Sequence, residues 1–137
     1  RVTLACSFGG VTGMALLHLA RQVAPEIDVF TVDTGFLFPE TVALRERSVR
    51  RYGMELRVVA PALSPEEQER LHGPALWARD PDRCCALRKV EPATRALSGR
   101  DAWVVGLRRD QASTRRTVAA LSWDEANGLY RIAPFWN

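Results

Sequence analysis

The sequence is poor in lysine and cysteine, and it has no long apolar run. Of its 19 basic residues, 18 are arginine, and the one lysine is Lys89. The longest apolar stretch is far shorter than the roughly 20 residues that a membrane span needs. No cationic segment leads into an apolar one with a small-residue cleavage site, so no secretory signal is visible. We therefore expect a cytoplasmic protein without membrane association.

The excess of positive over negative charge is also small. The formal net charge is +3 at pH 7, from 19 basic and 16 acidic side chains. This excess neither requires a nucleic-acid partner nor excludes an anionic small ligand, and we expect no nucleic acid. In a cytosolic protein we expect no structural disulfide.

The length suits one domain over residues 1–137, which can bury about two-thirds of its unfolded surface. The chain begins at Arg1 inside an expected strand and without a methionine. We therefore expect it to be a piece of a longer protein.

Strand-like and helix-like segments alternate along the first 60 residues. Short apolar runs predict strands, and apolar residues at helical spacing predict helices between them. In order, these are a strand at 2–6, a helix at 13–23, a strand at 27–33, a helix at 39–52 and a strand at 54–60. The alternation predicts an α/β fold, a parallel twisted sheet with helices on both faces.

The second half continues this pattern and ends differently. A Ser-x-x-Glu signature at 64–67 predicts a capped helix. Asp82 could cap a helix that begins near Cys84, and Pro92 should kink or restart that helix. After a strand at 102–106, an Asn-Gly pair at 127–128 lies between two plausible strands and predicts a short terminal β-hairpin.

Polar loops follow three of the predicted strands, and the carboxyl ends of parallel strands are where ligands bind. "SFGG" at 7–10 could cradle an oxyanion with backbone amides, or it could be an ordinary turn. Asp33 and Thr34 lie at the tip of the second strand, where Asp33 could accept a hydrogen bond from a ribose hydroxyl or an adenine amine, or could simply cap a helix or form a turn. "LRRDQASTRR" at 107–116 is rich in arginine, which matches phosphate or sulfate geometry, although solvated arginines are the alternative.

Cys84 and Cys85 are adjacent, and Arg88 and Lys89 follow them. Vicinal cysteines rarely form a disulfide, and zinc prefers two to four residues between its cysteines. An iron–sulfur cluster tolerates neighbouring ligands, and the cations would stabilise its negative charge. Two inert thiols are the alternative. Cys6 is the only other cysteine, so this chain cannot supply four ligands.

Together, these motifs resemble the assimilatory adenylyl-sulfate and phosphoadenylyl-sulfate reductases. "SFGG", "DTGFLFPET", "CCALRKVEP" and "GLRRDQ" followed by "TR" occur here in the same order as in that family. The resemblance implies an adenine nucleotide alpha-hydrolase-like fold. The paired cysteines imply the iron–sulfur branch, which uses adenylyl sulfate.

The resemblance also implies a mechanism and a set of partners. A cysteine beyond Asn137 would attack the sulfate sulfur, expel AMP and form an enzyme thiosulfonate, from which thioredoxin or glutaredoxin would release sulfite. Cys84 and Cys85 would supply two of the four ligands of a [4Fe-4S] cluster, and Lys89 would act electrostatically in catalysis. The implied substrate-binding residues are Ser7, Phe8, Gly9, Gly10, Asp33, Thr34, Gly35, Arg88, Lys89, Gly106, Arg108, Arg109, Gln111 and Arg115.

Other functions stay open at this point. They are a phosphoadenylyl-sulfate reductase, a related ATP pyrophosphatase or sulfurtransferase, and a nucleotide-binding module without catalysis. The first loop lacks the Asp-Ser pair of the pyrophosphatases, which favours binding of a nucleotide sulfate over cleavage of ATP. "VTG" at 11–13 replaces the acidic or glutamine residues common in the reductases. The sequence does not decide whether the protein forms homo-oligomers.

Overall fold

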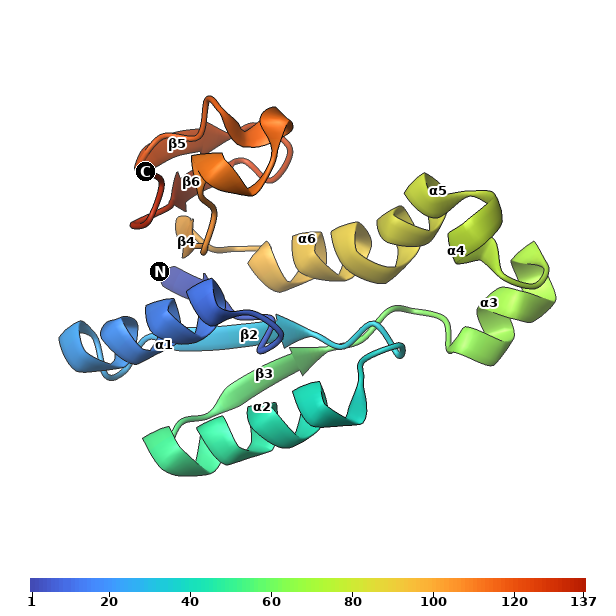
Figure 1. Cartoon of the computed structure of the whole chain (residues 1–137), viewed down its shortest axis with the longest axis horizontal. Coiled ribbons are helices and arrows are strands. Elements are labelled where there is room, and N and C mark those ends of the chain that lie inside the picture. Colours follow the sequence, from blue (N-terminus) through green and yellow to red (C-terminus); the bar gives the residue numbers. More distant parts are fainter.

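A six-stranded sheet forms the centre of the computed structural model, which describes all residues from 1 to 137 (Figure 1). The strand order is β3-β2-β1-β4-β6-β5. All neighbouring pairs are parallel except β5 and β6, which form the antiparallel hairpin. The strands are β1 (Val2–Ala5), β2 (Asp28–Val32), β3 (Leu56–Val59), β4 (Ala102–Val104), β5 (Leu121–Asp124) and β6 (Leu129–Ile132).

α-Helices connect the first four strands. The longest two, α1 and α2, each follow one of the first two strands, and a chain of shorter helices leads from β3 back to β4 (Figure 1). No helix is both long and apolar enough to cross a membrane. The helices are α1 (Val11–Val23), α2 (Pro39–Tyr52), α3 (Pro65–His72), α4 (Leu76–Arg79), α5 (Pro81–Cys85), a π-helical turn (Ala86–Val90) and α6 (Glu91–Leu97). Two short 3-10 helices, at Arg109–Gln111 and Ser113–Arg115, follow β4.

The sheet buries a different core on each face, because successive side chains of a strand point to opposite sides. Leu4 and Val29 lie opposite each other and pack with Leu17 of α1. Phe30, the next residue of β2, packs instead with Leu97 of α6. Helices on both faces of a parallel sheet are therefore confirmed.

Several local predictions are also confirmed. Ser64 accepts a hydrogen bond from the Glu67 amide, and the Glu67 carboxylate accepts one from the Ser64 amide, which completes the capping box. Gly128 has φ +66 in the turn between β5 and β6, a left-handed conformation that favours glycine. The helical pattern restarts at Glu91, next to Pro92, immediately after the π-helical turn.

The predicted start of the cysteine-bearing helix is wrong. α5 begins at Pro81, and the carboxylate of Asp80, not that of Asp82, accepts a hydrogen bond from the Arg83 amide at 3.0 Å. Proline suits the first helical position because its missing N–H would have no partner there. The cap therefore lies two residues earlier than the sequence suggested.

Candidate functional site

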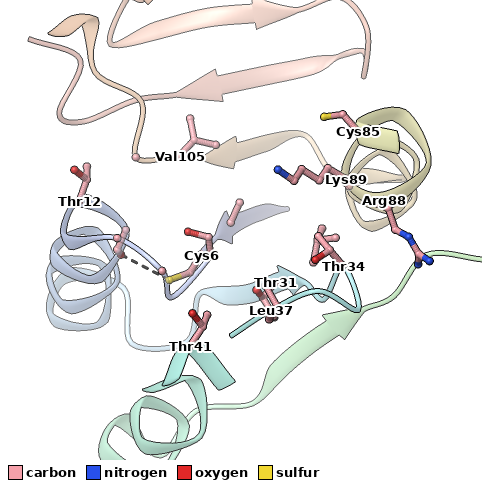
Figure 2. A pocket seen from close by; sticks show the side chains of 18 of the residues that line it. Cys6, Thr12, Thr31, Thr34, Leu37, Thr41, Cys85, Arg88, Lys89 and Val105 are labelled. Atoms are coloured by element: carbon pink, nitrogen blue, oxygen red, sulfur yellow. Dashed lines mark hydrogen bonds between the residues drawn. The ribbon is translucent and has the colours of Figure 1, made fainter. Parts of the chain in front are cut away.

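A cavity of about 1410 Å³ opens at the carboxyl ends of the central strands (Figure 2). It lies where the strand order reverses, with β2 on one side of β1 and β4 on the other. In open α/β sheets, ligands bind at such a switch point. All three predicted loops contribute to its wall, as does the cysteine-bearing helix. Of the sequence-predicted residues, the lining includes Ser7, Gly9, Gly10, Thr34, Cys84, Cys85, Arg88, Lys89, Gly106, Gln111 and Arg115.

The first loop brings backbone amides to the cavity. α1 begins directly after Gly10, with no side-chain cap and no acidic residue in its first turn. Its free N–H groups therefore remain available to an anion. The side chain of Phe8 does not share in this wall, because the residue takes a left-handed φ of +57° and buries its ring in the core.

The second loop lines the cavity with Thr34, Phe36 and Phe38, whereas Asp33 and Gly35 lie outside the lining. Asp33 Oδ2 accepts a hydrogen bond from Arg45 at 2.9 Å, and Oδ1 accepts one from the Gly35 amide at 3.0 Å. Burial raises the pKa of Asp33, but these hydrogen bonds and the Arg45 charge outweigh it and hold the pKa below its ordinary value. In this structure Asp33 forms the turn and pairs with α2.

The third loop sends one arginine into the cavity. Arg115 lines it, together with Gly106 and Gln111. Arg108 instead pairs with Asp110, its Nε lying 2.8 Å from Oδ1, and donates to Thr12 Oγ1, also at 2.8 Å. The pairing with Asp110 raises the pKa of Arg108.

Arg109, the neighbour of Arg108, also lies outside the cavity lining. Its Nε donates to the Val118 carbonyl at 2.8 Å, and its guanidinium carbon lies 4.3 Å from the centroid of the Trp136 ring. Both contacts fix the loop against the C-terminal segment. The arginine-rich loop is thus mostly self-bound, and Arg115 is the member placed to meet an anion.

The cysteine-bearing helix closes the cavity from the other side. Lys89 is exposed and points into the cavity. Arg88 also belongs to the lining, but it is buried and its side chain points away from the cavity (Figure 2). Cys85 is exposed, Cys84 is buried, and both thiols are free. No three His, Cys, Asp or Glu side chains come together to hold a metal ion. The helix thus presents two adjacent free thiols, Cys84 and Cys85, beside Lys89.

Sequence reasoning missed several residues of this wall. Thr12 lines the cavity and receives Arg108, and its place two residues after "SFGG" could have signalled it. Cys6 also lines the cavity, and burial raises its pKa to about 11, although a hydrogen bond from Phe8 partly opposes that rise. Trp77 of α4 belongs to the rim, and nothing in its sequence context predicted that position.

The architecture and the motifs agree with one family of proteins. The family model described as "Phosphoadenosine phosphosulfate reductase domain" matches residues 1–137, the whole chain. The chain belongs to the phosphoadenosine phosphosulfate reductase family. This result confirms the family that the sequence motifs suggested.

Individual members of the reductase family show the same similarity. The chain is 48% identical over 119 residues to an adenosine 5'-phosphosulfate reductase of Rhodococcus erythropolis, covering 87% of this chain and 48% of that protein. It is 40% identical over 135 residues to a phosphoadenosine 5'-phosphosulfate reductase of Gloeobacter violaceus, covering 98% and 56%. The chain thus spans about half the length of the curated relatives that it matches.

Solved structures support the fold. A phosphoadenylyl-sulfate reductase from Candida auris, crystallised as a phosphate complex, matches with a TM-score of 0.82 and 30% identity, over 99% of this chain and 66% of that one. An FMN adenylyltransferase of Candida glabrata matches with a TM-score of 0.61 at 15% identity. The second likeness extends to the fold alone, which is shared between reductases and a nucleotide-transferring enzyme.

Proposed function

We propose that this chain is the sulfonucleotide-binding part of a reductase that converts adenylyl sulfate to sulfite and AMP in assimilatory sulfate reduction. The observation that carries the proposal is the cavity at the switch point, whose wall brings together Lys89, Arg115 and the amino end of α1 beside two free thiols. Relatives over most of the chain bear the name adenosine 5'-phosphosulfate reductase, which supports this substrate.

The charges in the cavity suit a mixed sulfate–phosphate anhydride. Lys89 and Arg115 supply two cations, and the uncapped amides at the start of α1 supply hydrogen-bond donors. Fixed donors and cations stabilise charge that develops on an oxyanion without a cost of reorganisation during the reaction. We assign the sulfate and phosphate groups to this polar wall. Lys89 then offsets the repulsion that an attacking thiolate meets at an anionic sulfate.

The proposed reaction has two steps. A cysteine thiolate from a segment outside this chain attacks the sulfate sulfur, the bond from sulfur to the AMP phosphate oxygen breaks, and a Cys-S-SO₃⁻ group forms. A thiolate of thioredoxin or glutaredoxin then attacks the cysteine sulfur, which releases sulfite and leaves a disulfide that the reductant's second thiol resolves. Both electrons come from the reductant. We place this reaction in the cytoplasm.

The adjacent thiols fit half of a [4Fe-4S] ligand set. Cys84 and Cys85 are both free and both line the cavity, and the cationic Lys89 lies on the following helical turn. We propose that they ligate two irons and that two cysteines outside this chain complete the set. When bound, the cluster would supply a fixed local charge next to Lys89. The paired cysteines also favour adenylyl sulfate over its 3'-phosphorylated form, as in the family branch that carries them.

The full-length protein provides the test. With thioredoxin and adenylyl sulfate, we expect sulfite release at least about tenfold faster than with the 3'-phosphorylated substrate. Iron and sulfide analysis should give about four of each per chain. Faster turnover of the 3'-phosphorylated substrate would reverse the substrate assignment. Release of pyrophosphate from ATP, without sulfite from either sulfonucleotide, would favour the pyrophosphatase alternative.

A further inference from the structure

Arg88 is the one charged residue that the fold buries, with 2% of its surface exposed. Its Nη1 donates to the Leu63 carbonyl at 2.7 Å, while Nε and Nη2 have no hydrogen-bond partner. No carboxylate lies within ion-pair distance of it, although the Glu66 carboxylate is near enough to interact electrostatically. Burying a cation without a direct ion pair is costly, so its position calls for a further compensating contact.

That contact is the ring of Phe36. The guanidinium carbon of Arg88 lies 5.2 Å from the ring centroid, a cation–π arrangement that gains strength when it is shielded from water. Phe36 is 52% exposed and lines the cavity. Arg88 therefore packs on the Phe36 ring from the protein interior, while Phe36 also lines the cavity.

The backbone beside Phe36 fits closely over the same guanidinium. Gly35 has φ +77°, and a Cβ on it would lie 3.0 Å from Pro65 Cγ and 3.9 Å from Arg88 Nη1. The loop thus packs tightly onto the start of α3, and it lies within ordinary van der Waals distance of Arg88. Arg88 joins three segments that are distant in sequence: the 34–38 loop, the Leu63 carbonyl and the cysteine-bearing helix.

The cysteine-bearing helix has a buried side and an open side. Cys84 and Arg88, four residues apart, are both buried, whereas Cys85 and Lys89 are both exposed. Figure 2 shows Lys89 directed over the cavity and Arg88 directed away from it, toward the segment that follows β3. The two neighbouring cations therefore have different surroundings.

We propose that Arg88 is a positioning residue, which holds the 34–38 loop against the cysteine-bearing helix so that Thr34 and Phe36 stay in the cavity wall. Lys89 is then the cation of this pair that meets the ligand. This role replaces the direct substrate contact that the sequence predicts for Arg88. The identity of the ligand rests on the proposed function, but the hold on the loop does not.

Hydrogen exchange in the ligand-free, full-length protein tests that hold directly. We expect the amides of residues 33–38 to exchange about tenfold faster in Arg88→Met and Phe36→Leu than in the parent protein. Arg95→Met is the matched control, because Arg95 donates to the Ala60 carbonyl beyond β3 but does not contact the loop. Unchanged exchange in both Arg88→Met and Phe36→Leu would overturn the proposal.

Binding of AMP and steady-state turnover of adenylyl sulfate test the consequence for the site. Each single variant should weaken AMP binding about tenfold, and the double variant should be no weaker than the weaker single one. KM should rise while kcat stays within about twofold. Additive losses, or a loss of kcat at unchanged KM, would overturn the positioning role.

Two additional cases keep the test of Arg88 separate from the test of the proposed function. If Arg88→Met does not fold, Arg88→Lys replaces it as the single variant and in the double variant with Phe36→Leu, since an ammonium keeps the charge but not the planar stack on Phe36. If the parent protein binds no AMP, the proposed function fails, and the exchange experiment still decides whether Arg88 holds the loop.

Discussion

Gly106, at the end of β4, lies against Thr12, at the start of α1, so closely that a Cβ on Gly106 would come within 3.2 Å of Thr12 Cγ2 and 3.6 Å of the Gly13 amide nitrogen. Arg108 reinforces the contact by donating to Thr12 Oγ1. The first and third loops of the site are thus locked together across the switch point. A Cβ at position 106 would require Thr12 to shift by a few tenths of an ångström, and a larger side chain would require more.

Gly106→Val should therefore destabilise the protein and weaken nucleotide binding. Overpacking of this kind typically costs about 1–3 kcal/mol, which urea unfolding would measure. Gly10→Ala is the matched control for stability, because a Cβ there meets nothing within 4 Å. Equal unfolding free energies for the two variants would show that the loops tolerate separation.

Gln111→Glu should weaken the binding of anionic nucleotides through Arg115. The side-chain Nε2 of Gln111 donates to the Gly106 carbonyl at 3.2 Å. Its side-chain Oε1 accepts hydrogen bonds from the backbone N–H of Arg108 and from the Arg115 guanidinium. A carboxylate would keep the contact with Arg115 but cancel its charge, for an expected loss in AMP affinity of about tenfold. In an Arg115→Met background the same change should cost clearly less, because only the direct effects of the new carboxylate remain, and a full tenfold loss there would contradict this explanation.

The three thiols should react at different rates in the iron-free protein. Cys85 is exposed and Cys84 is buried, and the Cys6 pKa of about 11 leaves almost no thiolate at neutral pH. With iodoacetamide at pH 7.5, we expect Cys85 to be alkylated first and Cys6 last, as followed by peptide mass spectrometry. Denatured protein, in which all three should react at similar rates, is the control. Early alkylation of Cys6 would contradict the structure.

Asp28→Asn should destabilise the protein at neutral pH and make little difference in acid. Burial alone would raise the pKa of Asp28. Hydrogen bonds from Arg57 and Thr3 and the charges of Arg57 and Arg100 lower it by more, so the pKa lies below its ordinary value. A lowered carboxyl pKa stabilises the folded protein above the unfolded pKa of about 3.9, and this contribution disappears as the pH falls through the folded pKa.

Because the Asp28 group is partly exposed, we expect a loss of about 1 kcal/mol at pH 7 for Asp28→Asn. Urea unfolding at pH 7 and near pH 3 measures it. Asp82→Asn serves as the control, since Asp82 is exposed and makes no ion pair. A difference of the same size at both pH values would argue against an ionic origin.

The sequence predicted those parts of the molecule that depend on local rules. Helical spacing, the Ser64 capping box and the Asn127-Gly128 turn follow from near neighbours, and the parallel sheet follows from their alternation. The meeting of three loops at one edge followed from the sheet. Each of these features needs only chain order and backbone geometry.

The assignment of individual side chains depended on partners that the sequence does not reveal. Asp33 is held by Arg45 of the following helix, and Arg109 is held by Trp136, 27 positions later. Phe8 adopts a left-handed conformation that places its ring in the core. Identical residue types can therefore face a ligand or a neighbour, and only tertiary packing separates the two.

The central strand also bears on how the protein matures. One edge of β1 pairs with β2, but at the other edge Val2 pairs with Ala102, so that edge must wait for a neighbour synthesised about 100 residues later. Contacts between such distant segments form slowly, because the intervening chain loses entropy when its ends meet. A ribosome-bound nascent chain that has not yet released β4 has no complete pocket, and retention on an immobilised nucleotide would therefore report finished folding.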